Sequence, residues 1–325
     1  MQIITTGSIA YDYLMRFPGK FTDHFITEQM HQVSLSFLVD QMTKHWGGVA
    51  ANIAYSMALL GLRPKLMGTA GRDFNDYRDW LESVGVDCST VKQIDDDFTA
   101  SFFCTTDEEN NQIASFYAGA MRHAAHYSLA DAQVDNPDLV VISPNDPTAM
   151  TNLAHECRAQ GIPFIYDPSQ QVPRLNGDEL ARDMQGAHAM IVNAYEAEII
   201  SKKTGMSFAQ INDSVDILVI TQGPRGCHIH VNGDRTDVEA FPTDTIVDPT
   251  GVGDAFRAGF IYGMINGWSL ELAAQVGSLC AVYVLENVGT QNHRYTIPAF
   301  VERFRSQYDD HGRLDELLAH TESAG

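Results

Sequence analysis

The stretch DPTGVGDAFRAGF, Asp248 to Phe260, decides the interpretation of this chain. Gly251 and Gly253 lie within three residues, an aspartate follows at once, and an apolar segment with helical spacing begins there. Glycines let backbone N–H groups converge on one point, and a helix N-terminus adds unpaired N–H groups and the positive end of its dipole. The stretch therefore predicts an anion hole, with Asp254 beside it to accept the proton of an attacking hydroxyl. The alternative is a plain glycine turn and an aspartate that only caps the helix.

Other glycine patterns narrow the class of phosphate-binding protein. The sequence has no G-x-x-x-x-G-K-[ST] motif and no G-x-G-x-x-G between a strand and a helix. These absences disfavour a Walker-type ATPase and a dinucleotide enzyme. It also has no H-R-D or D-F-G motif, which disfavours a protein kinase.

The composition predicts a folded protein with a sizeable core. The chain has 325 residues, of which 44% are hydrophobic, and a formal net charge of -21. This acid excess disfavours an extended nucleic-acid surface but leaves room for a local phosphate site. No apolar run approaches the ~18 residues of a membrane span, and the N-terminus does not resemble a signal peptide. The five scattered cysteines form no C-x-x-C pair, which disfavours a disulfide framework or a zinc site and predicts a cytoplasmic protein.

Strand-like and helix-like segments alternate over most of the chain. DLVVISP, PFIYDPS, HAMIVNA and DILVITQG are short apolar runs typical of parallel strands that are buried on both faces. TASFFCTTD and NQIASFYAG, with a polar connection between them, predict a hairpin. The sequence thus predicts an α/β body formed by residues 1–15, 46–95 and 121–325, and a β-rich lid formed by residues 16–45 and 96–120. The lid would cover the carboxyl ends of the main strands, where ligands bind in open α/β sheets.

Five motifs, in order, resemble those of the ribokinase-like, or PfkB, family of small-molecule kinases. DPTGVGDAFRAGF resembles its C-terminal signature, GGVAANIA at 47–54 its N-terminal glycine signature, NAYE at 193–196 its N-x-x-E motif and TQGPRG at 221–226 its nucleotide turn. Asp12 follows the first strand, where the family has a substrate-binding aspartate. The resemblance runs from about residue 3 to 300. It implies a three-layer α/β/α kinase with a mostly parallel sheet and a small β-sheet lid. GSIAYDYLMRFPGKF, LSFLVD and LENVGTQNHR are most similar to adenosine and nucleoside kinases.

The resemblance assigns the catalytic residues. Asp254 is the expected general base, which would activate a primary hydroxyl of the acceptor. Gly251, Val252 and Gly253 are expected to supply the backbone amides of the anion hole. Arg257 follows the base by about one helical turn, and contact with a phosphate, a surface role or a packing role fits this position.

The resemblance also assigns the acceptor site. Asp12, Gly48 and Asn52 are expected to bind the sugar, because a carboxylate can accept from two vicinal hydroxyls and an amide can both donate and accept. A turn acid and a helix-start residue are the alternatives for Asp12 and Asn52. Relatives often have Asn four residues before the aspartate, whereas this chain has Ser8, whose hydroxyl can also form hydrogen bonds.

The nucleotide side is expected to involve Asn193, Glu196, Thr221, Gly223, Gly226 and Asn287. Mg²⁺ keeps most of its waters, so Glu196 is expected to act on it through water; a glutamate on a helix surface is the alternative. Asp248 lies where some relatives bind K⁺.

Three lid aromatics, Phe37, Phe103 and Phe116, are candidates for stacking on a purine and excluding water. An ordinary role in the lid core is the alternative for each of them. The histidine pairs His123/His126 and His228/His230 have metal-like spacing, but neither has an obvious third ligand, which favours a structural role.

These features predict a Mg-dependent kinase that transfers the γ-phosphoryl group of ATP to a nucleoside 5′-hydroxyl, with adenosine as the expected acceptor and purine salvage as its setting. The same chemistry on ribose or a ketose is one alternative. A non-catalytic ligand-binding protein on the same fold is another. Lid strands often pair between subunits in the family, which makes a homodimer a further expectation.

Overall fold

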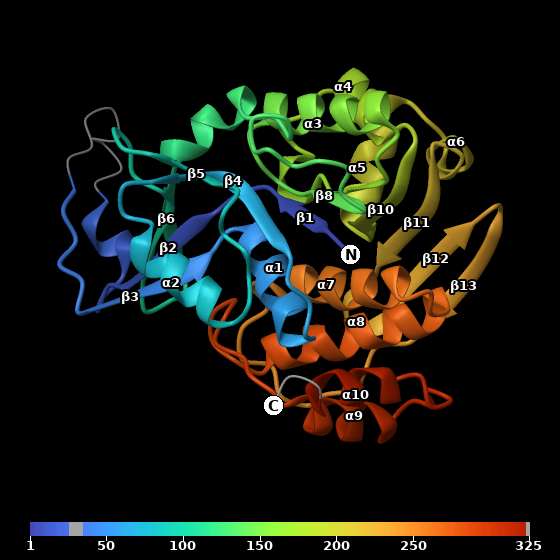
Figure 1. Cartoon of the computed structure of the whole chain (residues 1–325). Helices are drawn as coiled ribbons and strands as arrows, with labels where there is room; N and C mark the ends of the chain where they lie inside the picture. The colour runs from blue at the N-terminus through green and yellow to red at the C-terminus, as the bar shows by residue number, and fades with distance from the viewer. Residues whose placement is uncertain (26–34, 323–325) are drawn as a thin grey trace.

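A large sheet organises the molecule. The computed structural model describes residues 1–25 and 35–322. Among them, nine strands form a sheet of order β13-β12-β11-β10-β9-β8-β1-β4-β5 (Figure 1). The strands from β11 to β5 run parallel, and β12 and β13 add an antiparallel hairpin at one edge. The bounds are β1 Ile3–Thr6, β4 Lys65–Gly71, β5 Val91–Ile94, β8 Leu139–Ile142, β9 Phe164–Tyr166, β10 Ala187–Asn193, β11 Val215–Thr221, β12 Cys227–Val231 and β13 Asp234–Val238.

Helices cover both faces of this sheet. Figure 1 shows α3, α4 and α5 on one side, α7 and α8 on the other, and α9 and α10 as a further layer outside α8. The bounds are α1 Val49–Leu59, α2 Asn75–Ser83, α3 Pro147–Gln160, α4 Gly177–Met184, α5 Ala194–Thr204, α6 Phe208–Asn212, α7 Val252–Ile265, α8 Leu270–Leu285, α9 Ile297–Arg305 and α10 Asp315–Glu322. None of the helices in the described part of the chain is long and apolar enough to cross a membrane.

Helices cover both faces of the sheet, and successive side chains of a strand point to opposite faces. Both sets of side chains in the parallel strands are therefore apolar. In β8, Val140 and Ile142 belong to the hydrophobic core beneath α3, α4 and α5. Their neighbours Leu139 and Val141 belong to the core on the other face, with residues of α1, α7 and α8. This double burial explains why the strands lack the alternation of polar and apolar residues that is typical of a half-exposed sheet.

The segments predicted as the lid form a separate sheet of order β3-β2-β6-β7, at the left in Figure 1, and the name lid is kept for this sheet. Its bounds are β2 Ala10–Arg16, β3 Gln41–Gly47, β6 Ala100–Thr106 and β7 Gln112–Tyr117. β6 and β7 form the predicted hairpin. The sheet differs from the predicted boundaries, which gave residues up to 15 and from 46 onward to the body. Its first strand, β2, already begins at Ala10, and its second strand, β3, ends at Gly47. Over its whole length β2 pairs with both β3 and β6.

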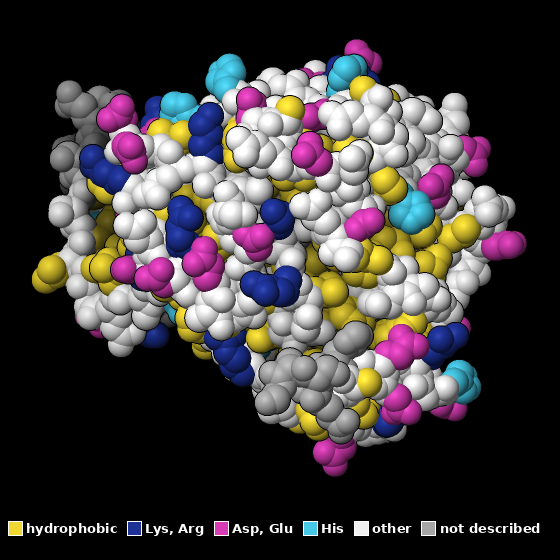
Figure 2. Space-filling model, viewed as in Figure 1, with side chains coloured by type: hydrophobic (Ala, Val, Ile, Leu, Met, Phe, Trp, Pro, Cys, Tyr) yellow, Lys and Arg dark blue, Asp and Glu magenta, His cyan; other side chains and the backbone are white. Residues whose placement is uncertain are grey.

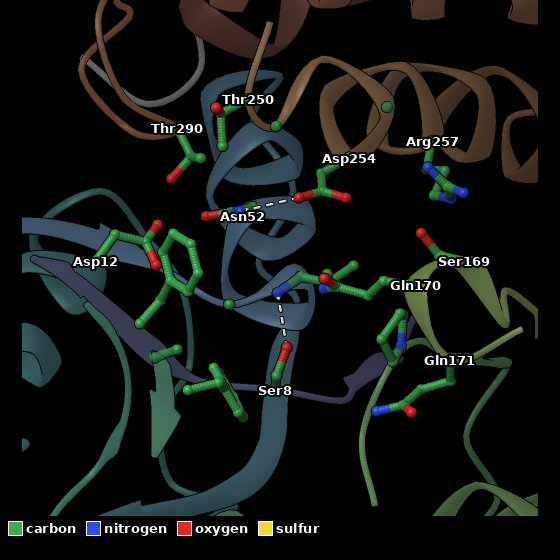
Figure 3. A pocket seen from close by; sticks show the side chains of 18 of the residues that line it. Ser8, Asp12, Asn52, Ser169, Gln170, Gln171, Thr250, Asp254, Arg257 and Thr290 are labelled. Carbon is green, nitrogen blue, oxygen red and sulfur yellow. Dashed lines mark hydrogen bonds between the residues drawn. The ribbon is translucent and has the colours of Figure 1, made fainter. Parts of the chain in front are cut away.

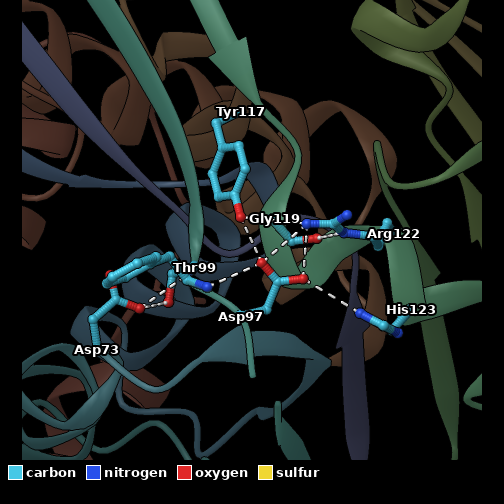
Figure 4. Close-up of polar contacts among 8 residues, drawn as sticks. Asp73, Asp97, Thr99, Tyr117, Gly119, Arg122 and His123 are labelled. Atoms are coloured by element: carbon cyan, nitrogen blue, oxygen red, sulfur yellow. Dashed lines mark hydrogen bonds and ion pairs between the residues drawn. The ribbon is translucent and has the colours of Figure 1, made fainter. Parts of the chain in front are cut away.

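Asp97 joins the lid hairpin to the body (Figure 4). Its carboxylate accepts a hydrogen bond from the Tyr117 hydroxyl at 2.6 Å, at the end of β7. It also lies 3.0 Å from Arg122 Nη2 and 3.4 Å from His123 Nε2, both in the 3₁₀ segment η3, Gly119–His126. Both connections of the hairpin therefore meet at one buried carboxylate. The contact gives His123 a structural role, as the sequence favours.

Charges of both signs are mixed on the surface. On the face in Figure 2, Lys and Arg side chains lie singly or in small groups among acidic ones. Hydrophobic side chains also reach the surface of the lid, including Phe98, which is 47% exposed, and Phe116, which is 50% exposed.

The carboxyl ends of the parallel strands meet at one edge of the large sheet, where β10 ends at Asn193 and β11 at Thr221. The N-terminal turns of α1 and α7 lie at the same edge, since Asn52 and Asp254 are hydrogen-bonded there. This convergence is what positions the candidate site.

Candidate active site

A cavity of about 630 Å³ lies at this edge (Figure 3). Strand ends, the first turns of α1 and α7, and the lid all contribute to its wall. Of the residues predicted from the sequence, it is lined by Ser8, Asp12, Gly48, Asn52, Phe116, Asn193, Glu196, Thr221, Gly251, Gly253, Asp254 and Arg257. Residues up to about 250 positions apart in the sequence thus line one chamber.

The N-terminus of α7 requires both of its glycines. Gly251 caps the helix at φ 79°, a conformation that favours glycine. A Cβ at Gly253 would lie 2.7 Å from Arg257 Nη1, so any larger residue would displace that guanidinium. The side chain of Val252 packs instead against the core around α8 and α9, and this residue is not among those lining the cavity. The predicted anion hole uses the backbone amides of Gly251, Val252 and Gly253, so the direction of the Val252 side chain leaves that prediction unchanged.

Asp254 is buried in the first turn of α7. Its Oδ2 accepts a hydrogen bond from Asn52 Nδ2 at 2.8 Å. Burial raises the pKa of Asp254 to about 6, although Arg257 and the Asn52 hydrogen bond act in the opposite direction. A carboxylate with this pKa is ionised at neutral pH and is more basic than an exposed aspartate, as general base catalysis requires.

A chain of hydrogen bonds fixes the orientation of the Asn52 amide. Asn52 Oδ1 accepts from Gln291 Nε2 at 2.9 Å, and Gln291 Nε2 also donates to the Tyr77 hydroxyl at 2.6 Å. Trp80 Nε1 donates to Gln291 Oε1 at 3.1 Å. Since the Asn52 oxygen is held by Gln291, its amide nitrogen is the atom that faces Asp254. Sequence reasoning missed Gln291 and Tyr77, because nothing in their local sequence marks them.

Asp12 lies on β2, within the same chamber. Burial, and after it the nearby carboxylates of Asp248 and Asp254, together raise the pKa of Asp12 to about 6. Gly48, at φ 92°, leaves no room for a side chain, since a Cβ would lie 2.5 Å from Ser8 O. The Ser8 hydroxyl accepts a hydrogen bond from Val49 N at 2.9 Å and so satisfies a donor at the start of α1. In this structure Ser8 therefore lines the cavity with a side chain that already has a partner.

Asn193 and Glu196 form a capping box at the start of α5. Asn193 Oδ1 accepts from Glu196 N, and Glu196 Oε2 accepts from Asn193 N, both at 2.8 Å. The N-x-x-E motif thus has a local structural role, and both residues also line the cavity. Within residues 1–25 and 35–322, no three His, Cys, Asp or Glu side chains are arranged to hold a metal ion. The Glu196 carboxylate, which lines the cavity, fits a water-mediated contact with Mg²⁺.

The other predicted nucleotide residues are dispersed. Thr221 lines the cavity, and a side chain at Gly223 would enter open space. Gly226 has a packing reason, because a Cβ there would overlap Val238 O. Asn287 lies two residues beyond the end of α8, donates to Tyr283 O of that helix at 2.8 Å and is not among the cavity-lining residues. The Asp248 carboxylate accepts from Thr250 N and Gly289 N, each at 2.9 Å. Burial of Asp248 raises its pKa, but these hydrogen bonds outweigh burial and lower the pKa overall.

The lid aromatics only partly fit the sequence prediction. Phe116 lines the cavity, whereas Phe103 stacks on Tyr13 at 4.9 Å between ring centroids, outside the main cavity. Phe102, its neighbour in β6, lines the cavity instead and pairs in register with Asp12. The choice of Phe103 was wrong by one residue, which in a strand reverses the face. Phe37 packs against Phe17, Phe21 and His24 in a cluster of the lid and is not a cavity-lining residue.

The segment after β9 also contributes to the cavity and was missed. Ser169, Gln170, Gln171 and Arg174 line it, starting with the last residue of the strand-like run PFIYDPS. A position just beyond the carboxyl end of a parallel strand is the signal that could have found them.

Comparisons with known proteins identify the family and the fold. Residues 8–297 match the pfkB family of carbohydrate kinases. The chain is 28% identical over 305 residues to a nucleoside kinase of Methanocaldococcus jannaschii, and the match covers 93% of this chain and 96% of that protein. Burkholderia thailandensis nucleoside kinase in complex with inosine is 35% identical, with a TM-score of 0.83, and the match covers 95% of this chain and 98% of that one. The complex of the same enzyme with ADP-inosine has a TM-score of 0.79 at 35% identity and covers 95% and 96%. The predicted ribokinase-like α/β fold is confirmed.

Proposed function

The chain belongs to the pfkB family of carbohydrate kinases and is an ATP-dependent kinase, and we propose that it phosphorylates the 5′-hydroxyl of a purine nucleoside. The observation that carries the proposal is the pairing of two acids in one cavity. Asp254 lies at the N-terminus of α7, and Asp12 lies on the lid strand β2. This arrangement provides one carboxylate for the reacting hydroxyl and another for the sugar.

In the proposed reaction, Asp254 accepts the proton of the 5′-hydroxyl as its oxygen attacks the γ-phosphorus of ATP. The bond from that phosphorus to the β–γ bridging oxygen breaks, and ADP leaves. Backbone N–H groups around Gly251 and Gly253, at the positive end of α7, stabilise the charge on the transferred group. The Asn52 hydrogen bond holds the Asp254 carboxylate in position for the proton transfer.

The sugar is proposed to lie between Asp12 and Asp254. Asp12 would accept hydrogen bonds from the vicinal 2′- and 3′-hydroxyls, and Gly48 would let the backbone approach the ring. Asn193, Glu196, Thr221 and Gly223 lie toward the proposed nucleotide side, with Glu196 contacting Mg²⁺ through water. Mg²⁺ would neutralise charge on the phosphates of ATP.

The base is proposed to be a purine covered by the lid. Phe102 and Phe116 are aromatic lining residues from neighbouring strands of the lid, and a purine offers them a face for stacking. Adenosine is the acceptor that the sequence predicts. Inosine is a second candidate because the Burkholderia thailandensis enzyme is 35% identical and was solved with inosine.

The test is ADP release from Mg-ATP with the purified full-length chain and adenosine, inosine, guanosine, cytidine, ribose or fructose as acceptor. We expect turnover with at least one purine nucleoside, little with the free sugars, and loss of that turnover in Asp254→Asn. Turnover confined to ribose or fructose would overturn the nucleoside proposal. Full activity of a folded Asp254→Asn variant would overturn the proposed base.

We also propose that the lid pairs with a second copy of the chain. β7 is an edge strand of the lid sheet, exposed along its length, and it carries Ile113, Phe116 and Tyr117. Apolar residues on an open edge favour strand pairing between subunits. Sedimentation analysis of the wild type and of Ile113→Lys tests this: we expect a dimer that the substitution weakens, and a monomeric wild type would contradict it.

The cysteines are all free and buried, which supports a reducing cytoplasmic setting.

A further inference from the structure

A buried ion pair lies directly behind the candidate base. Arg257 Nε is 2.6 Å from Asp167 Oδ2, and Arg257 Nη2 donates to Asp167 Oδ1 at 2.7 Å. Nη2 also lies 3.3 Å from the backbone oxygen of Ile191 in β10. Arg257 is 6% exposed and Asp167 is fully buried. The guanidinium is thus held by a two-point contact with a carboxylate and by one backbone carbonyl.

The pair connects the catalytic helix to the edge of the sheet. Asp167 is the first residue after β9, and Arg257 follows Asp254 by one turn of α7. The remaining guanidinium nitrogen, Nη1, occupies the space that a side chain at Gly253 would need, 2.7 Å from its Cβ position. The positive charge therefore lies against the backbone of the anion hole. Figure 3 shows Arg257 on the same wall of the cavity as Asp254.

We propose that Arg257, held in place by Asp167, is a positioning residue that keeps Asp254 in its ionised, proton-accepting form. The inference rests on the proposed function, in which Asp254 is the base. It assigns to these two residues a task in the reaction rather than only in folding.

The charges around Asp254 are mostly negative. The charged groups that face it or share its cavity are Arg257 on α7, Asp12 on β2, Glu196 on α5, Asp167 after β9, and Arg174 after η4, Ser169–Gln171. Burial and nearby acids favour the neutral form of a carboxyl, whereas a cation within one helical turn favours the charged form. Burial is the largest influence on the Asp254 pKa, Arg257 is the largest influence that lowers it, and Glu196 raises it.

Asp167 sets the strength of this effect. Its carboxylate pairs with Arg257 and so weakens the field that the guanidinium exerts on Asp254. Removal of the two partners should therefore have opposite effects on the base. A pair that only tied α7 to the sheet would weaken folding in both variants without moving the pKa of Asp254 in opposite directions.

The test is the pH dependence of kcat/KM for the nucleoside at saturating Mg-ATP, which reports the ionisation of the free base. In Arg257→Gln we expect the acid limb to move up by about one pH unit, the size of shift that loss of one close charge produces. Activity well below the limb should then fall about tenfold relative to activity at alkaline pH. In Asp167→Asn the limb should move to lower pH. Arg305→Gln is the matched control, because Arg305 forms a similar two-point pair with Asp310 in the C-terminal region, and it should leave the limb unchanged.

Two further variants guard against misfolding. Arg257→Lys keeps the charge and should restore the limb toward the wild-type pH, and the double variant Asp167→Asn/Arg257→Gln should lie between the two single variants. Circular dichroism melts establish that each protein is folded. Unchanged or equally displaced limbs in the folded single variants would overturn the inference while leaving Asp254 as the base. Activity of Asp254→Asn would instead remove the proposed function itself.

Discussion

Replacing Asp254 by Asn should stabilise the protein at neutral pH while it removes turnover. The pKa of this buried carboxyl is raised from 3.8 to about 6, so the folded protein holds its proton more tightly than the unfolded chain does. The free energy of unfolding therefore falls as pH rises from about 4 to about 6. Above that range the whole destabilisation by the ionised Asp254 is present. At about 1.4 kcal/mol for each pKa unit, the cost is about 3 kcal/mol.

Asparagine is neutral at every pH and can still accept the Asn52 hydrogen bond. We expect Asp254→Asn to gain up to about 3 kcal/mol at pH 8 and to gain nothing at pH 4, where Asp254 itself is protonated. For a chain of 325 residues, an unfolding entropy of about 2.1 cal/mol/K per residue converts this gain to about 4 °C in Tm. Turnover should fall by about 10²–10⁴, the usual contribution of a positioned general base.

The assay is a series of thermal melts of the ligand-free wild type and variant between pH 4 and pH 8. Asp310→Asn is the control of opposite sign, because the hydrogen bonds from Arg305 lower the pKa of Asp310, and its loss should destabilise the protein most at neutral pH. A stability difference between wild type and Asp254→Asn that does not change with pH would refute the reasoning.

Three further predictions concern the acceptor site. Asp12→Asn should raise the nucleoside KM about 10–100-fold, because hydrogen bonds to a charged group contribute about 1.5–3 kcal/mol; steady-state kinetics checks this, and an unchanged KM would place the sugar elsewhere. Phe102→Ala should raise the KM for a purine nucleoside about tenfold through lost stacking, whereas Phe103→Ala should not, and equal effects would contradict the assigned faces. Gly48→Ala should lower the free energy of unfolding by about 1–3 kcal/mol. A side chain at φ 92° is strained, and its Cβ would lie 2.5 Å from the backbone oxygen of Ser8. A thermal melt like that of the wild type would contradict this.

Local patterns were sufficient for the fold and for the residues of the glycine-rich turns. The parallel strands were predictable because each is a short apolar run buried on both faces, and Gly251 and Gly48 because positive φ favours glycine. The position of Asp254 followed from the same stretch. These features are encoded within about ten neighbouring residues, so one sequence is enough to find them.

The residues that orient the site could not be found in this way. Gln291 is hydrogen-bonded to Asn52 across 239 positions of sequence, and Arg257 is paired with Asp167 across 90. No local pattern records such contacts, since they exist only after the sheet has brought the strand ends together. Phe103 illustrates a different limit, because a strand that carries Phe102 and Phe103 side by side does not reveal which face is inward. The register with β2 decides which of the two side chains faces the cavity, because Phe102 pairs with Asp12.

The concentration of acids in the cavity bears on the class of acceptor. Asp12 and Asp254 both have raised pKa values, and burial is the first cause for each. In the ligand-free site, desolvation of these carboxylates is unfavourable. A ligand that donates hydrogen bonds to them would offset this desolvation energy. A neutral acceptor rich in hydroxyl groups does so, whereas an acceptor that already carries a phosphate would add negative charge beside Asp12. We therefore expect uncharged nucleosides to bind on the acceptor side, with polyphosphate neutralised by Mg²⁺ on the other, and nucleoside binding should stabilise the protein more at pH 8 than at pH 5.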